Sequence, residues 1–209
     1  MTISIDYNFA VGSMSVHSVL TQWSAGFNTA GHGLSNTGGF NGGARELSGE
    51  QYATHGTNDS DYAFIAGSDT SKGLNYVFNP KIPSGDNMNH FLWGELDNVK
   101  LGEVLTGGSG STFGLEDYTV SFNGLDLSAA SDAGRAGNAV QDVIYGLMKG
   151  DVSGLEGVLN NLLSGFGLST DSTFDQLAAA GLAHSDAPLA ADISLIGVLD
   201  VAQDWALAA

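Results

Sequence analysis

A tyrosine and two histidines are the residues of this chain whose types and positions could do chemistry. Tyr76 lies within the apolar stretch Leu74 to Phe78, and His90 opens the next strand-like stretch. His32 stands in a glycine-rich segment where no regular element is expected to bury it. Tyrosinate and imidazole are both axial ligands of haem iron, and a partner that accepts the phenol proton makes tyrosinate the better donor. These three residues therefore predict a haem site formed by two loops.

The positions of Tyr76 and His90 fit an antiparallel hairpin made of residues 74–79 and 91–96. Such a hairpin brings His90 to the phenol as a proton acceptor, which favours ionisation of a hydroxyl whose free pKa is about 10. Two less specific interpretations stay open. Tyr76 could be a half-buried tyrosine of the sheet, and His32 could be a solvated loop residue.

The remaining sequence offers few alternative sites. His17, His55 and His184 have no ligand-like neighbours and are expected to be structural or solvated. The chain has no cysteine, which excludes disulfides, thiolate metal sites and a cysteine nucleophile. It also contains no P-loop, no His-Glu-x-x-His and no Gly-x-Ser-x-Gly motif. An enzyme would have no recognisable catalytic residues.

The composition is that of a folded, strongly acidic protein. The 209 residues are 43% hydrophobic and include 30 glycines, which predicts one sizeable core with many turns and long loops. Six Lys and Arg stand against 23 Asp and Glu, for a net charge of −17. Such a charge repels nucleic acid and anionic membrane surfaces and favours a soluble monomer. No apolar stretch approaches the roughly 20 residues of a membrane span, so membrane insertion is not expected.

Hydrophobic periodicity predicts an α+β fold. Strands are expected at residues 3–9, 50–55, 61–67, 73–79, 91–99 and 117–124, and helices from Ser13 to Phe27, 140–147, 155–162 and 174–182. Because most strands precede most helices, we expect an antiparallel sheet with a helical layer packed on one face. In the segment 117–124, Tyr118, Val120 and Phe122 are expected to share one face of the sheet. Residues 28–46 are expected to form a long functional loop.

Ordered motifs give the chain a family resemblance. It resembles the HasA-type haemophores, bacterial proteins secreted to scavenge haem, over nearly its whole length. The matching segments are Leu20-Thr21-Gln22-Trp23-Ser24-Ala25, Asn36-Thr37-Gly38-Gly39-Phe40, Ser48-Gly49-Glu50-Gln51-Tyr52-Ala53, Ala63-Phe64-Ile65-Ala66-Gly67, Tyr145-Gly146-Leu147-Met148-Lys149-Gly150-Asp151 and Ser172-Thr173-Phe174-Asp175-Gln176-Leu177.

The resemblance implies a site and a function. In such a protein a curved antiparallel sheet backs onto a helical layer, and haem is held at one edge between two loops. The family's iron ligands correspond to His32 and Tyr76, and the histidine that bonds the phenol corresponds to His90. The implied cofactor is haem b, ferric protoporphyrin IX, taken from host haemoproteins. The protein would hand it unaltered to a TonB-dependent outer-membrane receptor.

The chain ends also bear on location. The N-terminus lacks the basic region and apolar run of a secretory signal, so export through the general secretory route is not expected. By resemblance, residues 186–209 form an uncleaved C-terminal signal read by a type I ABC exporter, and residues 1–185 form a single haem-binding domain. The protein is then secreted and extracellular, and the lack of cysteine agrees with export as an unfolded chain.

Three departures from the family pattern leave alternatives. The loop after His32 is shorter, residues 81–89 lengthen the segment between Tyr76 and His90, and Gln141 stands where the family has a further histidine. If His32 does not reach the iron, an open coordination position would suit a haem enzyme. A secreted structural protein or adhesin without haem is the other alternative.

Overall fold

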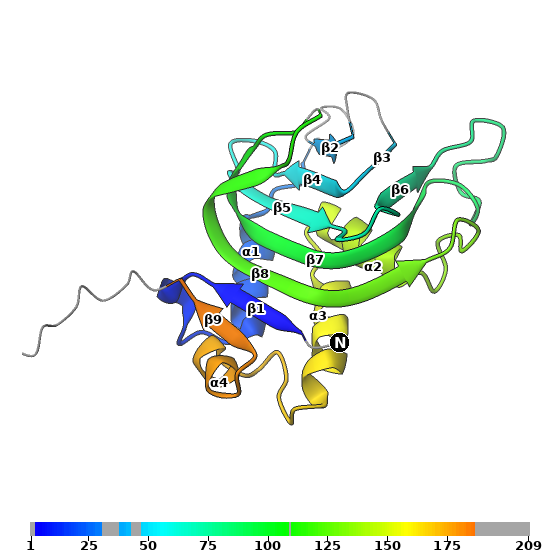
Figure 1. Ribbon diagram of the computed structural model, residues 1–209. Helices are drawn as coiled ribbons and strands as arrows, with labels where there is room; N and C mark the ends of the chain where they lie inside the picture. The colour runs from blue at the N-terminus through cyan, green and yellow to red at the C-terminus, as the bar shows by residue number, and fades with distance from the viewer. Residues whose placement is uncertain (1–2, 31–37, 43–46, 109, 187–209) are drawn as a thin grey trace, which may run out of the picture.

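The computed structural model describes residues 3–30, 38–42, 47–108 and 110–186, and it confirms the α+β architecture (Figure 1). One curved sheet of nine strands forms one layer, and α1, α2 and α3 lie behind it in the view of Figure 1. His32 lies outside the described residues, as does the predicted secretion tail beyond residue 186.

The sheet is antiparallel except at one edge. Its strands are β1 (Ser4–Tyr7), β2 (Gly38–Phe40), β3 (Ser48–Gly49), β4 (Gln51–His55), β5 (Tyr62–Gly67), β6 (Leu74–Val77), β7 (Phe91–Thr106), β8 (Gly114–Ala129) and β9 (Ala183–Ser185). The strand order is β2-β4-β5-β7-β8-β1-β9, and the short β3–β6 pair joins the sheet through β7. Only the last pair, β1 with β9, is parallel. One long strand, β7, therefore carries both β5 and β6 on the same edge.

The helices begin close to the predicted positions, most of them at side-chain caps, although the helix Ser153–Ser164 has none. They are the 3-10 helix η1 (Phe9–Val11) and the α-helices α1 (Val16–Gly26), α2 (Ala139–Met148), α3 (Ser153–Ser164) and α4 (Phe174–Ala179). Ser15 rather than Ser13 caps α1, because its hydroxyl accepts the Ser18 backbone N–H. Thr173 forms a capping box with Gln176 at the start of α4. No helix in the described part of the chain is long and apolar enough to cross a membrane.

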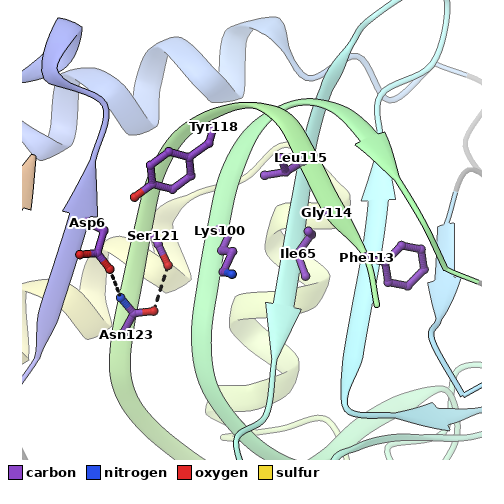
Figure 2. Close-up of a pocket in the computed structure, with 9 residues that line it drawn as sticks. All are labelled: Asp6, Ile65, Lys100, Phe113, Gly114, Leu115, Tyr118, Ser121 and Asn123. Atoms are coloured by element: carbon purple, nitrogen blue, oxygen red, sulfur yellow. Dashed lines mark hydrogen bonds between the residues drawn. The ribbon is translucent and has the colours of Figure 1, made fainter. Parts of the chain in front are cut away.

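A β-bulge turns Tyr118 away from the core. Leu101 pairs with Val120 but the next residue, Gly102, pairs with Tyr118, so Thr119 has no partner across the strands. The extra residue shifts the alternation of side chains by one position. Tyr118 consequently lines a cavity on the outer face of the sheet with Ser121 (Figure 2), and the prediction that it shares the face of Val120 was wrong.

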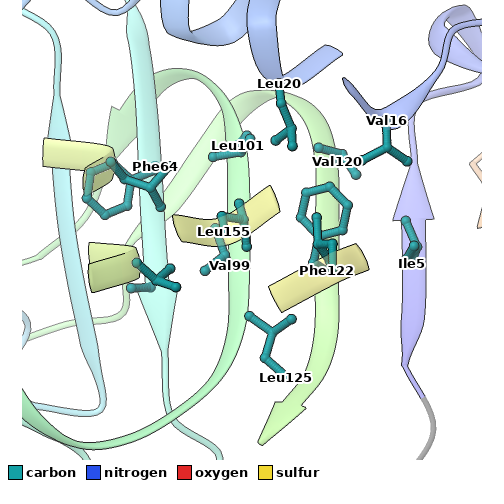
Figure 3. Close-up of a cluster of buried hydrophobic side chains, with 14 of the residues drawn as sticks. Ile5, Val16, Leu20, Phe64, Val99, Leu101, Val120, Phe122, Leu125 and Leu155 are labelled. Atoms are coloured by element: carbon teal, nitrogen blue, oxygen red, sulfur yellow. The ribbon is translucent and has the colours of Figure 1, made fainter. Parts of the chain in front are cut away.

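The core lies between the sheet and the helices (Figure 3). Val99, Leu101, Val120 and Phe122 project from the two long strands and are fully buried, as are Leu20 of α1 and Leu155 of α3, which pack on them. Trp23 of α1 also donates its indole N–H to the Ala63 carbonyl of β5 at 3.1 Å. A truncation such as Phe122→Ala is expected to cost about 3–5 kcal/mol, because a cavity would replace the ring.

Candidate functional site

The hairpin of β6 and β7 places Tyr76 at the edge of the sheet. Tyr76 pairs with Leu92, and its side chain packs against the core on the helix side. Gly94 makes the close approach of the two strands possible. Its φ is 118°, and a Cβ atom there would lie 2.1 Å from the carbonyl oxygen of Gly73. The observed pairing of β6 with β7 confirms the antiparallel hairpin that was predicted from residues 74–79 and 91–96.

His90 reaches the Tyr76 phenol from the residue just before β7. The Tyr76 Oη and His90 Nδ1 atoms are 2.6 Å apart. A neutral imidazole with its proton on Nε2 accepts this hydrogen bond from the phenol. His90 has a φ of 56°, a left-handed conformation that histidine adopts more readily than most residues. The Phe78 ring lies against the same imidazole, with the ring centroids 5.1 Å apart.

Several charges and burial together set the pKa of the Tyr76 phenol. Burial raises this pKa, the nearby Arg135 cation lowers it, and Tyr145 raises it. The net effect is a pKa above the usual value for tyrosine, so the phenol is protonated at neutral pH. A ligand that requires the phenolate must therefore find an acceptor for the proton, and His90 is hydrogen-bonded in that position.

Large apolar side chains surround the tyrosine–histidine pair and face solvent. Phe78, two residues along the strand from Tyr76, is 51% exposed, and Tyr145 of α2 is 49% exposed. Leu47 is 47% exposed, and its carbonyl accepts the Tyr76 backbone N–H at 2.7 Å. Exposed apolar residues gathered around a polar pair are typical of a binding surface. A flat aromatic ligand fits this combination.

Two further contacts support the site, one of them part-buried and one at the surface. The Tyr52 hydroxyl donates to the Met148 Sδ atom at 3.4 Å. Burial raises the pKa of Tyr52 well above its usual range, and the Tyr76 phenol raises it further. The Lys149 ammonium lies 5.1 Å from the centre of the Tyr145 ring, a cation–π contact that holds the ring from outside. Tyr52 is therefore a supporting residue, whereas Tyr76 is the phenol that can ionise.

The long segment between the two site residues is closed by Asn89. Asn89 as a whole is only 1% exposed. Its Nδ2 donates to the carbonyls of Asn79 and Ile82 at 3.0 and 2.8 Å. Its Oδ1 accepts the backbone N–H of Asn79 at 2.8 Å and that of His90 at 3.0 Å. One buried amide thus fixes both the turn and the backbone of the histidine.

Arg135 and Asn87 clamp the same segment to the loop before α2. The Arg135 guanidinium donates to the carbonyls of Ser84 and Asp86. In the opposite direction, the Asn87 Oδ1 accepts the backbone N–H groups of Arg135 and Ala136 at 3.0 and 2.8 Å. These bonds hold the lengthened segment in place and fix the cation that acts on the phenol of the site.

Gln141, which replaces a family histidine by resemblance, has a structural contact in this chain. It is 5% exposed, and its Oε1 accepts the Leu92 backbone N–H at 2.7 Å. Asn138 caps α2 and donates to the Leu92 carbonyl at 2.8 Å. Both polar groups of Leu92 are therefore tied to the start of α2, which anchors the hairpin to the helical layer.

The structure brings together two of the three predicted site residues, Tyr76 and His90. The third, His32, lies outside the described residues. His17 is paired with Glu156 at 2.7 Å, and His55 Nδ1 lies 2.6 Å from the Gly56 carbonyl oxygen.

Sequence reasoning missed the supporting residues, which are Asn89, Arg135 and Tyr145. The signal for Tyr145 was its place in the quoted Tyr-Gly-Leu-Met motif. No sequence motif or periodicity pointed to Asn89 or Arg135, which both lie in loops.

Comparison with known proteins places this fold among haem-binding proteins. The chain is 40% identical over 196 residues to Hemophore HasA of Serratia marcescens, covering 90% of this chain and 97% of the relative. Solved structures of the hemophore HasA from Yersinia pestis are similar in both forms. The holo form has a TM-score of 0.69 and the apo form 0.68, each at 26% identity over 88% of this chain and 98% or 96% of the other.

The heme-binding protein A (HasA) family matches residues 1–209, and the chain belongs to this family. It is a haem-binding carrier, a haemophore, and not an enzyme. The alternatives of an adhesin without haem and of a haem enzyme are not favoured.

Proposed function

We propose that this protein captures ferric haem b through the phenolate oxygen of Tyr76, with His90 as the partner of that phenol and His32 as a second iron ligand. The observation that carries the proposal is the 2.6 Å contact between Tyr76 Oη and His90 Nδ1 at a surface lined with exposed apolar side chains. Ferric haem supplies a Lewis-acidic iron that accepts tyrosinate and imidazole as axial ligands. The residues present fit that group.

The Tyr76 phenol must lose its proton before its oxygen can bind iron as phenolate. Tyr76 is protonated in the free protein because burial raises its pKa. On binding, Nδ1 accepts the phenol proton along the existing hydrogen bond and the ring releases its other proton to solvent, so a neutral imidazole stays beside the phenolate. The Arg135 cation favours the phenolate as well, since it lowers the pKa of this phenol. Reversal of the same transfer weakens ligation when haem is given up.

The apolar residues position the macrocycle. Phe78, which directly follows β6, and Tyr145 of α2 present exposed ring surface near the tyrosine–histidine pair. Their burial against a planar ligand supplies hydrophobic binding energy in addition to the bonds to the iron. The haem propionates are directed to water, because a chain with a net charge of −17 offers few cations to hold them.

The wider role follows from the family. We infer a monomeric, extracellular carrier that takes haem from host haemoproteins and delivers it to a TonB-dependent outer-membrane receptor. Residues 1–185 form the haem-binding domain, and residues 186–209 form the signal for a type I ABC exporter. The hemophore name of the Serratia relative and the holo form of the Yersinia neighbour support this assignment.

Haemin titration of single variants tests the assignment of ligands. Tyr76→Phe, His90→Ala and His32→Ala are compared with the wild type, and Tyr62→Phe serves as a control that removes a hydroxyl from another strand. Tyr76→Phe is expected to lose the tyrosinate absorption band and to weaken binding by about 100-fold or more. If only Tyr76→Phe and His90→Ala lose affinity, ligation from the tyrosine side suffices. Unchanged affinity and spectrum in Tyr76→Phe would refute the proposal.

A further inference from the structure

A second cavity lies on the outer face of the sheet, away from the haem site (Figure 2). Its volume is about 430 Å³, within the range of small-ligand sites. Four side chains in register cross its floor, one from each of the strands β5, β7, β8 and β1: Ile65, Lys100, Ser121 and Asp6. Tyr76 projects from the helix side of the sheet instead, so the two sites are separate.

Lys100 is a cation without a partner in this cavity. It makes no hydrogen bond or ion pair with any residue that the structure describes. Two other cations are engaged by contrast, because Lys72 pairs with Glu95 and Arg135 donates to backbone carbonyls. In a chain with 23 acidic residues, an unpaired lysine whose side chain lines a cavity is a position for an anionic ligand.

The neighbouring polar side chains leave one further donor unused. Asp6 Oδ2 accepts from Asn123 Nδ2, and Ser121 Oγ donates to Asn123 Oδ1, each at 2.9 Å. The Tyr118 hydroxyl is buried near the Ser121 backbone N–H, and its own proton has no acceptor among the described residues. Burial and the charge of Asp6 raise the pKa of this phenol far above neutrality, so it keeps its proton and can donate it. An unmade bond of this kind is costly unless a ligand completes it.

The opposite side of the cavity is apolar. The turn between β7 and β8 bends over the sheet, because the Phe113 backbone N–H donates to Gln51 Oε1 at 2.7 Å and Gly110 donates to the Asn41 carbonyl at 3.0 Å. Phe113 and Leu115 then stand beside Ile65 and form a wall. Figure 2 places Lys100 between this wall and the polar group of β8 and β1.

We propose that this cavity binds a small amphiphilic monocarboxylate. Its carboxylate accepts hydrogen bonds from the Lys100 ammonium and the Tyr118 hydroxyl, and its aromatic or aliphatic body lies on Ile65, Leu115 and Phe113. The site suits a single negative charge, because Lys100 is its one lysine or arginine and the Asp6 carboxylate, which also lines the cavity, repels a second. The site is independent of the haem ligands.

Amide chemical shifts of the ¹⁵N-labelled full chain without haem test this site. The probe is 3-phenylpropanoate, and 3-phenylpropan-1-ol is the matched neutral compound. The acid is expected to shift the amides of Lys100, Leu115 and Ser121 saturably and to bind at least about tenfold more tightly than the alcohol. Lys100→Met is expected to lose about tenfold in affinity for the acid but not for the alcohol, and Tyr118→Phe a smaller factor.

The spectrum of each variant also reports whether it is folded, so a loss of binding cannot be confused with unfolding. No saturable shift up to about 10 mM of the acid, or equal affinity for acid and alcohol, would overturn the proposal. Unchanged binding in a folded Lys100→Met protein would overturn it as well. Shifts confined to the β6–β7 hairpin would show that the probe prefers the haem site and would also refute it.

Discussion

Asn79 and Asn89 are joined by two hydrogen bonds that run in opposite directions. The Asn79 N–H donates to Asn89 Oδ1 at 2.8 Å, and Asn89 Nδ2 donates back to the Asn79 carbonyl at 3.0 Å. The excursion from Asn79 to Asn89 therefore has a closed base, and its length need not disturb the site. Asn89 is a positioning residue, since it acts on the phenol only through the backbone of His90.

Replacement of Asn89 by alanine is expected to separate positioning from ligation. Asn89→Ala leaves the N–H groups of Asn79 and His90 without their acceptor, which should lower the free energy of unfolding by about 1–3 kcal/mol. Haem affinity should fall by about tenfold while the tyrosinate band is kept. Urea unfolding and haemin titration measure the two effects. Asn89→Asp is the matched variant, because it keeps both acceptor contacts and should lose less affinity; equal losses in both variants would contradict this role.

Arg135→Gln is expected to raise the pKa of Tyr76 further. Burial already raises this pKa, and the cation opposes that effect, so removal of the cation leaves burial and Tyr145 unopposed. The pH dependence of the tyrosine Cζ resonance in ¹³C-labelled protein without haem reports the change, with Tyr76→Phe used to assign the signal. Arg135→Lys keeps the charge and should stay closer to wild type. A pKa that falls in Arg135→Gln would show that the cation does not act on this phenol.

Acid is expected to break haem ligation by protonating the imidazole beside the phenolate. A protonated imidazole donates at both nitrogens and can no longer accept the phenol proton at Nδ1. The absorption spectrum of the haem-loaded protein, recorded during acid titration, should then lose the tyrosinate band. His90→Gln has no titrating group at this position and should shift the loss towards the carboxylate range. A wild-type spectrum that is stable to about pH 4 would argue against proton transfer to His90.

The His17–Glu156 pair should make stability depend on pH on the other side of the molecule. The hydrogen bond to Glu156, and then its charge, raise the pKa of His17 in the folded state. The stabilisation is therefore fully present below the ordinary histidine pKa and is lost as pH rises through the raised value. The difference in Tm between wild type and His17→Gln should be larger at pH 6 than at pH 9. Glu156→Gln should remove this pH dependence, and a difference that grows with pH would contradict the pairing.

Much of this architecture was predictable because its signals are local. The alternation in residues 74–79 and 91–96 predicted the hairpin, and the apolar spacing of residues 140–147 predicted α2. The short strands β2, β3 and β9 were missed, since two or three residues carry no period and exist only through their partners.

The face of Tyr118 was also missed. It depends on a bulge between two strands, which neither sequence segment displays by itself. The pairing of Tyr76 with His90 followed from strand spacing, whereas the roles of Asn89 and Arg135 depend on how a non-repetitive loop closes. That closure arises from hydrogen bonds between distant segments rather than from any pattern along the chain.

The placement of β1 at the junction of two late segments bears on when the domain can fold. Its residues pair with positions 120–123 of β8 on one side and with positions 183–185 of β9 on the other. Each contact requires closure of a long loop, and folds dominated by such distant pairings form slowly. In a nascent chain, β1 consequently has no complete set of partner strands until nearly all of the domain has been synthesised. Until then the polypeptide is still unstructured and accessible to other proteins that bind unfolded chains.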